Sequence, residues 1–403
     1  MYIYKAAVVG AGTMGAEIAQ VISYSGLPVI LMDVNEKVVQ QGIQKARKLY
    51  QARVDKGKMT PEELEQKMAL ILPATTYDGF GDVDIVIEAV IEEIDIKKRV
   101  FQALDAACPE TTILATNTSA LSITELSFGT RRPDKVIGIH FFNPPHVMKL
   151  VEVIPGLATS PETLDDVMVF TEGLRKIAVR VQECAGFLVN RLLMPYLNEA
   201  TLAIQEGAAT IKEMDEAMTS FGMPMGPFTL ADLVGLDVAE KVAGILFESY
   251  GPRMNPASLL GEMVKAGRLG TKARKGFYDY EGDGDTAVQS LIEKIQRETG
   301  LKRTAFSPHR LLLPMINEAA ICLQEGVASA GDIDMAMMAG TGFPQAKGGP
   351  LHYADKVGID TVLSELQRLK GDLGFRFWPA PMLKRMVLAG YLGVKAGRGF
   401  FQY

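Results

Sequence analysis

A glycine-rich turn near the N-terminus is the feature that most restricts how this chain can fold. The motif VVGAGTMG follows an apolar strand directly and opens a helical stretch, AEIAQVISYSG. A second apolar run, PVILMD, comes next and ends in an acid. A lone G-x-G-x-x-G is weak evidence, but the succession of strand, turn, helix and strand is what a dinucleotide-binding unit requires. The turn therefore predicts a Rossmann-type domain.

The residues of this turn each have a physical role in holding a dinucleotide. Gly10 permits the tight turn, Gly12 lets the backbone approach the pyrophosphate, and Gly15 lets helix and strand pack closely. The pyrophosphate is expected at the helix N-terminus, where free amides and the helix dipole favour negative charge. Thr13 and Met14 complete the predicted cofactor-binding turn.

The acid that ends the second run, Asp33, would accept hydrogen bonds from the adenine ribose hydroxyls. Its charge would repel a 2′-phosphate, so we predict NAD rather than NADP as the cofactor. The alternative is a purely structural turn in an α/β domain, and the complete context favours cofactor binding.

The order of apolar and helical segments indicates the domain organisation. Apolar runs alternate with helical periods over residues 1–182, which favours a parallel sheet covered on both faces. After about residue 183 only helical segments follow. We predict an α/β Rossmann-type domain over 1–182, followed by two tandem all-α domains over 183–285 and 286–403. The apolar runs are AAVVG, PVILMD, VDIVIEAV, TILATN and KVIGIHFF.

An internal repeat is the reason for predicting two helical domains. RLLMPYLNEA returns as RLLLPMINEA at a shift of 119 residues, and two later segments return at a shift of 123. Copies of about 100 residues are far longer than solenoid repeats, so a duplicated domain is expected, joined by the polar stretch 281–286. The matching segments are 191–200 with 310–319, 226–237 with 349–360, and 270–280 with 393–403.

Composition excludes several other classes of protein. The net charge of −6 argues against a nucleic-acid partner, and no apolar run approaches the ~20 residues needed to span a membrane. Cys108, Cys184 and Cys322 have no metal-like spacing, which fits reduced thiols and no metal site. The first ten residues lack the layout of a signal peptide. We therefore expect a cytoplasmic protein.

A histidine and a glutamate form the candidate acid–base pair. His140 closes the strand KVIGIH, Glu152 lies in the next apolar stretch, and the NPP turn between them could bring them together. A carboxylate fixes the tautomer of a histidine and stabilises its imidazolium, which suits proton exchange with an alcohol. A strand-end histidine is also commonly a structural residue, so the pattern leaves both interpretations open.

Polar side chains follow other predicted strands. Asn117 and Ser119 come after TILAT, and Asn143 comes after HFF. Asn190 begins the first helical repeat. In an open parallel sheet, ligands bind outside the carboxyl ends of the strands. These residues are therefore candidates for the site, although Asn and Ser are also ordinary turn and cap residues.

Taken together, these motifs resemble the 3-hydroxyacyl-CoA dehydrogenases, including the 3-hydroxybutyryl-CoA dehydrogenases. The match covers the chain in order, and HFFNPP…KLVEVI followed by GFxxNR is its most specific part. The resemblance implies NAD-dependent oxidation of a 3-hydroxyacyl-CoA thioester, or reduction of the 3-ketone in reverse. The segments that carry it are GAGTMGAEIAQ, ATNTSALSIT, HFFNPPHVMKLVEVI, GFLVNRLLMPYLNEA and MGPFTLADLVGLD.

The resemblance also implies roles for individual residues. His140 is the general base in oxidation and Glu152 orients it, while Ser119 and Asn190 hydrogen-bond the 3-oxygen of the substrate. Lys272 resembles a residue that reaches the cofactor when domains close. The remaining positions implied to contact the cofactor are Glu92, Lys97, Asn117, Ser119 and Asn143.

The grip on coenzyme A is implied to lie in the helices after the second strand. Basic residues there would hold the phosphates of the ligand, with Arg53 and Lys56 as the main candidates. A solvated helix face explains these charges about as well. A serine that some relatives use is absent, and Ala46 takes its place. The basic residues are Lys45, Lys48, Arg53 and Lys56.

The second helical copy resembles the final domain of multifunctional β-oxidation enzymes. Those enzymes carry a hydratase domain ahead of the Rossmann unit, and this chain starts at the Rossmann strand, so no hydratase activity is expected. His309 stands where the first copy has Asn190, so we expect the second copy to be structural. It would pack on the first as an internal pseudo-dimer in a monomer, the alternative being a homodimer.

Two other functions fit parts of the pattern. A dehydrogenase of a non-CoA hydroxy acid would keep His140, Glu152 and the glycines but would not need the basic helices. A non-catalytic NAD-binding protein would need neither His140 with Glu152 nor Ser119 with Asn190, since packing requires none of them.

Overall fold

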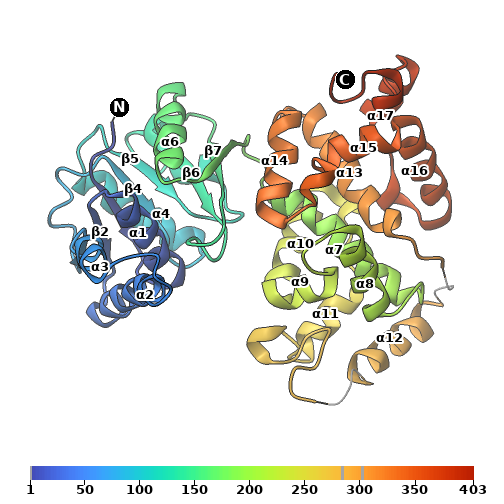
Figure 1. Cartoon of the computed structure of the whole chain (residues 1–403), viewed down its shortest axis with the longest axis horizontal. Coiled ribbons are helices and arrows are strands. Elements are labelled where there is room, and N and C mark those ends of the chain that lie inside the picture. The colour runs from blue at the N-terminus through green and yellow to red at the C-terminus, as the bar shows by residue number, and fades with distance from the viewer. Residues whose placement is uncertain (1, 283–285, 301–303) are drawn as a thin grey trace. The chain divides into compact units, whose positions relative to one another are not determined.

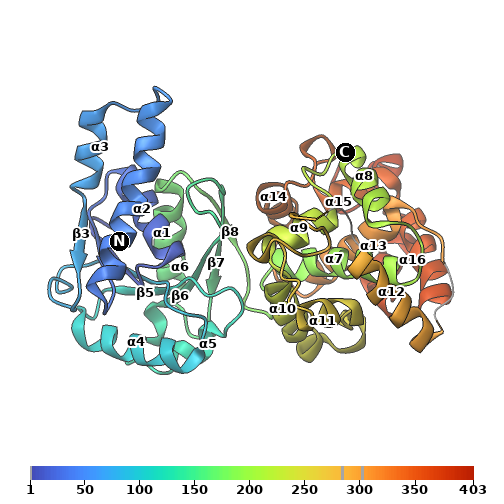
Figure 2. The same cartoon turned by 90° about the horizontal axis from the view of Figure 1, so that it is seen from below.

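The computed structural model describes residues 2–282, 286–300 and 304–403. The chain divides into two compact units, Met1–Phe187 and Leu188–Tyr403. Each unit is described by itself, and Figures 1 and 2 show their elements.

The first unit is built on one eight-stranded sheet with the order β3-β2-β1-β4-β5-β6-β7-β8. Neighbouring strands are parallel except β6 and β7, which pair antiparallel. The five predicted strands are present as β1, β2, β4, β5 and β6. The predicted parallel sheet is incomplete, because the chain reverses at the NPP turn and β7 pairs antiparallel with β6. The strands are β1 Ala6–Val9, β2 Val29–Met32, β3 Ile71–Ala74, β4 Ile85–Glu88, β5 Ile113–Thr116, β6 Val136–Phe141, β7 Leu150–Pro155 and β8 Ile177–Arg180.

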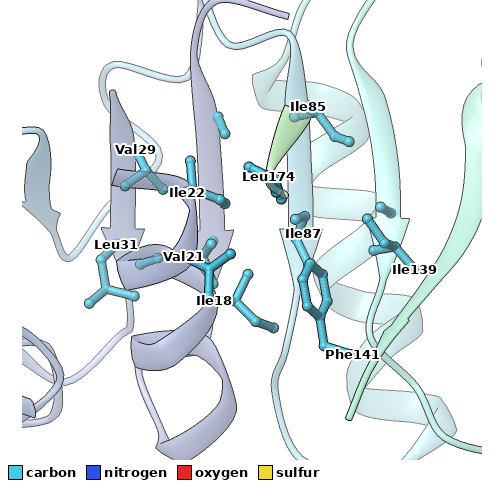
Figure 3. Packing of buried hydrophobic residues seen from close by; sticks show 14 of the residues in the cluster. Ile18, Val21, Ile22, Val29, Leu31, Ile85, Ile87, Ile139, Phe141 and Leu174 are labelled. Atoms are coloured by element: carbon cyan, nitrogen blue, oxygen red, sulfur yellow. The ribbon is translucent and has the colours of Figure 1, made fainter. Parts of the chain in front are cut away.

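Helices cover both faces of this sheet. The residues of β1, β2, β4 and β5 are buried throughout, so neither face of these central strands meets solvent. Figure 3 shows Ile18, Val21 and Ile22 of α1 packed among strand residues that include Val29 and Ile87. The helices are α1 Thr13–Ser25, α2 Glu36–Asp55, α3 Pro61–Met68, α4 Ile94–Ala107, α5 Ile123–Ser127 and α6 Pro161–Gly173.

Helices α2 and α3 form the predicted insertion after the second strand. They lie side by side and extend from the rest of the unit (Figure 2). Thr60 starts α3 with a capping box, in which its hydroxyl accepts from the amide of Glu63 and the Glu63 carboxylate accepts from the amide of Thr60. Ala46 is fully buried on α2, so this position packs in the core rather than facing a ligand.

The second unit is helical. Helices α7 and α13, which begin the two repeat copies, lie against each other, with α8–α11 following the first and α14–α17 following the second (Figure 1). The predicted join, 281–286, lies partly outside the described residues. The helices are α7 Val189–Gln205, α8 Ile211–Phe221, α9 Pro227–Val234, α10 Leu236–Tyr250, α11 Ser258–Lys265, α12 Thr286–Thr299, α13 Pro308–Gln324, α14 Ala330–Thr341, α15 Pro350–Val357, α16 Ile359–Leu373 and α17 Pro381–Leu388.

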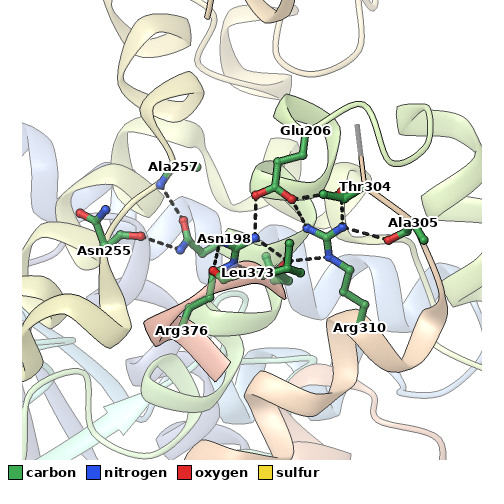
Figure 4. Close-up of polar contacts among 10 residues, drawn as sticks. Asn198, Glu206, Asn255, Ala257, Thr304, Ala305, Arg310, Leu373 and Arg376 are labelled. Atoms are coloured by element: carbon green, nitrogen blue, oxygen red, sulfur yellow. Dashed lines mark hydrogen bonds and ion pairs between the residues drawn. The ribbon is translucent and has the colours of Figure 1, made fainter. Parts of the chain in front are cut away.

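Buried ion pairs join the two repeat copies. Arg310 of α13 donates from Nε to Glu199 Oε1 at 2.7 Å and from Nη2 to Glu206 Oε2 at 2.5 Å. Its Nη1 donates to Thr304 and to the carbonyl of Ala305 (Figure 4). A buried guanidinium requires this degree of pairing, because an unpaired charge in the core costs several kcal/mol.

The same contacts occur in mirrored form from the first copy. Arg191 of α7 donates to Glu318 at 2.8 Å and to Glu325 at 2.7 Å. Arg191, Glu199 and Glu206 precede Arg310, Glu318 and Glu325 by the repeat shift of 119 residues. The two copies thus exchange the same contact in both directions, as self-complementary surfaces do across a two-fold axis.

Candidate active site

The glycine-rich turn joins β1 to α1 as the sequence predicts. Gly10 has a φ of +99°, and a Cβ there would lie 2.6 Å from the carbonyl oxygen of Ala89. A Cβ on Gly15 would lie 1.7 Å from the carbonyl oxygen of Gly10, so helix and strand could not approach. Both glycines are therefore required by the protein's own packing.

Gly12 differs from the other two glycines because, apart from the adjoining backbone, no described atom lies within 4 Å of the Cβ it lacks. It is the N-cap of α1, and no side chain caps the helix. Thr13 and Met14 form the first turn, whose amides are left to solvent or a ligand. This uncapped N-terminus beside an open backbone fits the pyrophosphate of a dinucleotide.

Asp33 directly follows β2 and is tied to the same turn. Its Oδ2 accepts from the amide of Ala11 at 3.0 Å, and its Oδ1 accepts from the amide of Asn35 at 3.2 Å. The carboxylate is thereby held at the carboxyl edge of the sheet, next to the glycine turn. This is where a ribose-binding acid is expected.

His140 and Glu152 face each other across the antiparallel pair of β6 and β7. The register places the two residues opposite each other, and His140 Nδ1 lies 2.7 Å from Glu152 Oε2. Both side chains are buried. Because the carboxylate holds Nδ1, Nε2 is the ring nitrogen that remains for proton exchange with a ligand.

Aromatic and amide groups frame the histidine. The ring centroids of Phe142 and Phe187 lie 4.6 and 5.8 Å from that of His140. Asn117, at the end of β5, accepts from the amide of Phe141 at 2.8 Å, which fixes the end of β5 against β6. Asn143 is exposed at the start of the turn that leads to β7.

Lys97 is buried among acids rather than exposed to a ligand. Its Nζ lies 2.8 Å from Glu88 Oε1 and 3.2 Å from Glu92 Oε2. Glu88, at the end of β4, also accepts from the hydroxyl of Thr116 at 2.7 Å. The contacts within the protein therefore assign Lys97 to holding Glu92 in place.

Glu92 connects this cluster to the loop that carries Ser119. Its Oε1 accepts from the hydroxyl of Thr118 at 2.6 Å and from the amide of Ser119 at 2.8 Å. Burial acts to raise the pKa of Glu92, but Lys97 and these hydrogen bonds outweigh burial and hold the pKa below its usual value. The carboxylate stays ionised and anchors Ser119, which is exposed after β5.

Sequence reasoning did not identify Glu88, Thr116 or Thr118. A signal was present, since Glu88 ends the otherwise apolar strand IVIE. A charge in a buried strand must be paired, and Lys97 follows nine residues later.

The four basic residues predicted to hold the coenzyme A phosphates, on α2 and at its C-cap, divide into two pairs. Lys45 forms an ion pair with Glu17 of α1 at 2.8 Å, and Arg53 donates to the hydroxyl of Tyr24 at 2.7 Å. Lys48 and Lys56 are exposed on the surface. Glu17 also meets His146 Nδ1 at 2.7 Å, a cluster that the sequence did not reveal.

The two other predicted site residues, Asn190 and Lys272, belong to the second unit. Asn190 is half-buried in the first turn of α7. Lys272 lies in a short 3₁₀ helix, Thr271–Ala273, and its Nζ meets Asp237 at 2.6 Å on the surface.

Within residues 2–282, 286–300 and 304–403, no group of three or more His, Cys, Asp or Glu side chains is placed to hold a metal ion. Over the same residues, no helix combines the length and the apolar composition that crossing a membrane requires.

Comparison with known families gives matches over both units. Residues 5–184 match the NAD-binding domain of 3-hydroxyacyl-CoA dehydrogenase. The model of that family's C-terminal domain matches twice, over residues 186–280 and 306–403. The predicted Rossmann-type domain, its NAD cofactor and the helical C-terminal part are thereby confirmed.

Individual relatives agree with these matches. The alpha subunit of the fatty acid oxidation complex from Shewanella sp. (strain MR-7) is 38% identical over 393 residues, 95% of this chain and 55% of that protein. The chain thus spans about half the length of the curated relatives it matches. The (S)-3-hydroxybutyryl-CoA dehydrogenase structure from Ralstonia eutropha is 40% identical and covers 70% of this chain and 100% of its own, with a TM-score of 0.68.

A structure of 3-hydroxybutyryl-CoA dehydrogenase from Escherichia coli K12 extends over both helical copies. It is 30% identical, covers 97% of this chain and 100% of its own, and gives a TM-score of 0.88. The chain belongs to the 3-hydroxyacyl-CoA dehydrogenase family.

Proposed function

We propose that this chain is an NAD-dependent 3-hydroxyacyl-CoA dehydrogenase, which oxidises the 3-hydroxyl of an acyl-CoA thioester or reduces the 3-ketone in reverse. The observation that carries the proposal is the buried contact of His140 with Glu152 at 2.7 Å. It stands at the carboxyl edge of a sheet whose first turn fits a dinucleotide. Packing alone does not require a buried, paired histidine at this edge.

Bound NAD supplies a hydride acceptor for C3 of the acyl chain. The chain's own residues handle the proton. Nε2 of His140 takes the proton of the 3-hydroxyl in oxidation, and Glu152 stabilises the imidazolium that forms. Ser119 and Asn190 would hydrogen-bond the 3-oxygen and so orient the reacting carbon.

The cofactor would be held by the chain's first turn and by the loops after β4, β5 and β6. We assign Gly10, Gly12, Thr13, Met14 and Gly15 to the pyrophosphate turn, of which Gly12 and the first amides of α1 would make the contact. Asp33 would accept from the adenine ribose. Further cofactor contacts are proposed for Glu92, Asn117, Ser119, Asn143 and Lys272. Lys97 would act on the cofactor only through Glu92, which it holds in place.

The coenzyme A phosphates would meet the exposed cations of α2. Arg53 and Lys56 were the main candidates from sequence, and the contacts favour Lys56 and Lys48, because Lys45 and Arg53 already have partners in the protein. An exposed lysine binds phosphate without first breaking an internal pair.

We also propose that the helical unit consists of two tandem domains, 183–285 and 286–403, after a Rossmann domain over 1–182. The double match of the C-terminal family model and the mirrored ion pairs of Arg191 and Arg310 support the duplication. Such a chain can satisfy its own two-fold interface and remain a monomer. A cytoplasmic location fits its three cysteines in 403 residues.

The activity test is oxidation of NADH with acetoacetyl-CoA, followed by absorbance and compared with free acetoacetate. We expect turnover of the thioester. His140→Ala should lower kcat at least ~100-fold, the low end for general acid–base catalysis. His352→Ala is the matched control, because His352 pairs with Asp334 at the same 2.7 Å in the second copy.

His352→Ala should keep kcat within about twofold of the wild type, since acid–base catalysis is assigned to His140 alone. Near-normal turnover in folded His140→Ala would remove the histidine from the mechanism. Turnover of free acetoacetate instead of the thioester would favour the dehydrogenase of a non-CoA hydroxy acid.

Cofactor preference tests the assignment of Asp33. We expect kcat/KM with NADH to exceed that with NADPH by at least ~10-fold, because a carboxylate beside a 2′-phosphate repels it. Asp33→Asn should narrow this ratio while it keeps the contact to the amide of Ala11. Equal efficiency with both cofactors in the wild type would show that Asp33 does not face the ribose.

A further inference from the structure

A pocket of about 560 Å³ lies between the two repeat copies of the helical unit. Helix α8 of the first copy forms one wall, and α13, α15 and α16 of the second copy form the others. It consists of residues that the proposed dehydrogenase reaction does not use.

A chain of three polar side chains crosses this pocket. His309 Nδ1 lies 3.3 Å from Glu365 Oε2, and His309 Nε2 lies 2.9 Å from the hydroxyl of Tyr353. The side chain of Arg368, one turn beyond Glu365 on α16, is 63% exposed. When both ring nitrogens carry protons, Nδ1 donates to Glu365 and Nε2 donates to Tyr353, so that the hydroxyl proton of Tyr353 is available to an anionic ligand.

The corresponding positions of the first copy are less polar. At the repeat shifts, Tyr353, Glu365 and Arg368 stand where the first copy has Leu230, Val242 and Ile245, and His309 stands where it has Asn190. Packing two helical copies together does not require the polar groups of Tyr353, Glu365 and Arg368, as the apolar residues at these positions of the first copy demonstrate. The second copy has therefore gained donors and charges around a space that is not filled by its own side chains.

The charges and the walls of the pocket define what it can bind. Arg368 provides a cation that meets Asp372 at 3.4 Å on the surface, while the carboxylate of Glu365 is occupied by His309. Phe221 and Leu369 supply apolar walls. An anion with an apolar body would satisfy both kinds of surface.

We propose that this pocket is a second ligand site, which binds a small organic carboxylate. The carboxylate would accept from Arg368 and from the hydroxyl of Tyr353, with His309 and Glu365 as positioning residues. The apolar body of the ligand would lie against Phe221 and Leu369.

The test is a fluorine-19 NMR titration of the full chain with 4-fluorobenzoate, in the absence of NAD and acyl-CoA. Saturable binding with a Kd of about 1 mM or tighter is expected for so small a ligand. Arg368→Gln should weaken binding about fivefold, as loss of a partly exposed charge contact does. Tyr353→Phe keeps the ring and should also weaken binding. The uncharged 4-fluorobenzyl alcohol should bind more weakly than the acid.

Arg385→Gln is the matched control, because Arg385 is an exposed arginine of α17 in the same copy and its contact is to Gln324. It should leave the Kd unchanged. Saturating NAD and acetoacetyl-CoA should not displace the probe, and this arm separates the pocket from the active site. The proposal is overturned by absence of saturable binding up to about 10 mM, a weak limit even for fragments. Equal Kd values for wild type and Arg368→Gln, or displacement by acetoacetyl-CoA, would also overturn it.

Discussion

In the first helical copy Asn190 stands in the first turn of α7, and in the second copy His309 stands at the same place in α13. One residue further along, both copies have a buried arginine, Arg191 and Arg310, and both reach glutamates of the other copy. In the second copy both residues line the candidate pocket, and the arginine also holds the copies together. At this helix start the copies therefore agree in the residue that forms the contact between them and differ in its neighbour.

A second buried contact is also kept in both copies. Asp232 accepts from the amides of Phe277 and Tyr278, and Asp355 accepts from the amides of Phe400 and Phe401 in the same way. These aspartates fix the last loop of each copy against its helices. A buried carboxylate that satisfies several amides cannot be replaced without leaving donors unpaired, which explains why the motif is kept.

The mirrored arginines give the largest expected effect on stability. Arg310→Met should lower the melting temperature of the helical unit by about 10 °C, which corresponds to about 3 kcal/mol, the low end for a broken buried ion pair, because Arg376 still donates to Glu199 and Glu206. Arg191→Met should cost about 1–2 kcal/mol less, because its partner Glu325 is 45% exposed whereas Glu206, the partner of Arg310, is 7% exposed. Thermal unfolding followed by circular dichroism measures both variants.

The two variants together test whether the mirrored contacts join the copies and whether the exposure of the partner carboxylate sets their cost. If Arg310→Met unfolds no earlier than the wild type, the mirrored contacts are not what joins the copies. If Arg191→Met is the more damaging variant, the exposure of the partner carboxylate does not set the cost. Leu388→Met on α17 is a suitable control, because its side chain is exposed and should change the melting temperature little.

Substitution of Asn190, which differs between the copies, should have a smaller effect, and on activity alone. Asn190→Ala should lower kcat/KM for acetoacetyl-CoA about tenfold, the loss expected for one hydrogen bond to the reacting oxygen. Its melting temperature should stay close to that of the wild type, because Asn190 is only half-buried. Unchanged kinetics would mean that the difference between Asn190 and His309 has no bearing on the dehydrogenase reaction.

Local signals were enough to predict much of the fold. The glycine turn with Asp33, the apolar strands and the repeat at 119 and 123 residues each identify an element by a pattern that is read along the chain. The turn between His140 and Glu152 indicated their contact for the same reason, since the two strands are joined by a short connection. Antiparallel pairing of β6 and β7 brings the two side chains together at 2.7 Å.

Contacts between distant elements could not be read in this way. A lysine in a helix, such as Lys97, is ordinarily exposed. Only the fold shows that its side chain is buried against Glu88 and Glu92. Lys45 belongs to a basic helix face, yet its charge is paired with Glu17 of another helix. In both cases an acid on another element pairs with the lysine, and how the elements pack decides whether the charge can serve a ligand.

The smallest expected effect concerns a lysine that both copies keep. Lys272 meets Asp237 at 2.6 Å, and Lys395 meets Asp360 at 2.6 Å in the second copy. A hydrogen bond from each lysine lowers the pKa of its aspartate below the usual value, so the two pairs are electrostatically alike. Any difference in function between them must come from a ligand that only one of them meets.

We propose that the ligand is the cofactor and that Lys272 meets it. Lys272→Met should raise the KM for NADH about threefold to fivefold, the effect expected for one exposed charge contact. Lys395→Met removes an equivalent ion pair from the second copy and should leave the KM within about 1.5-fold of the wild type, since we assign no cofactor contact to it. Steady-state kinetics over a range of NADH concentrations measures both. Equal KM values in the two variants would show that Lys272 serves only to hold Asp237, as Lys395 holds Asp360.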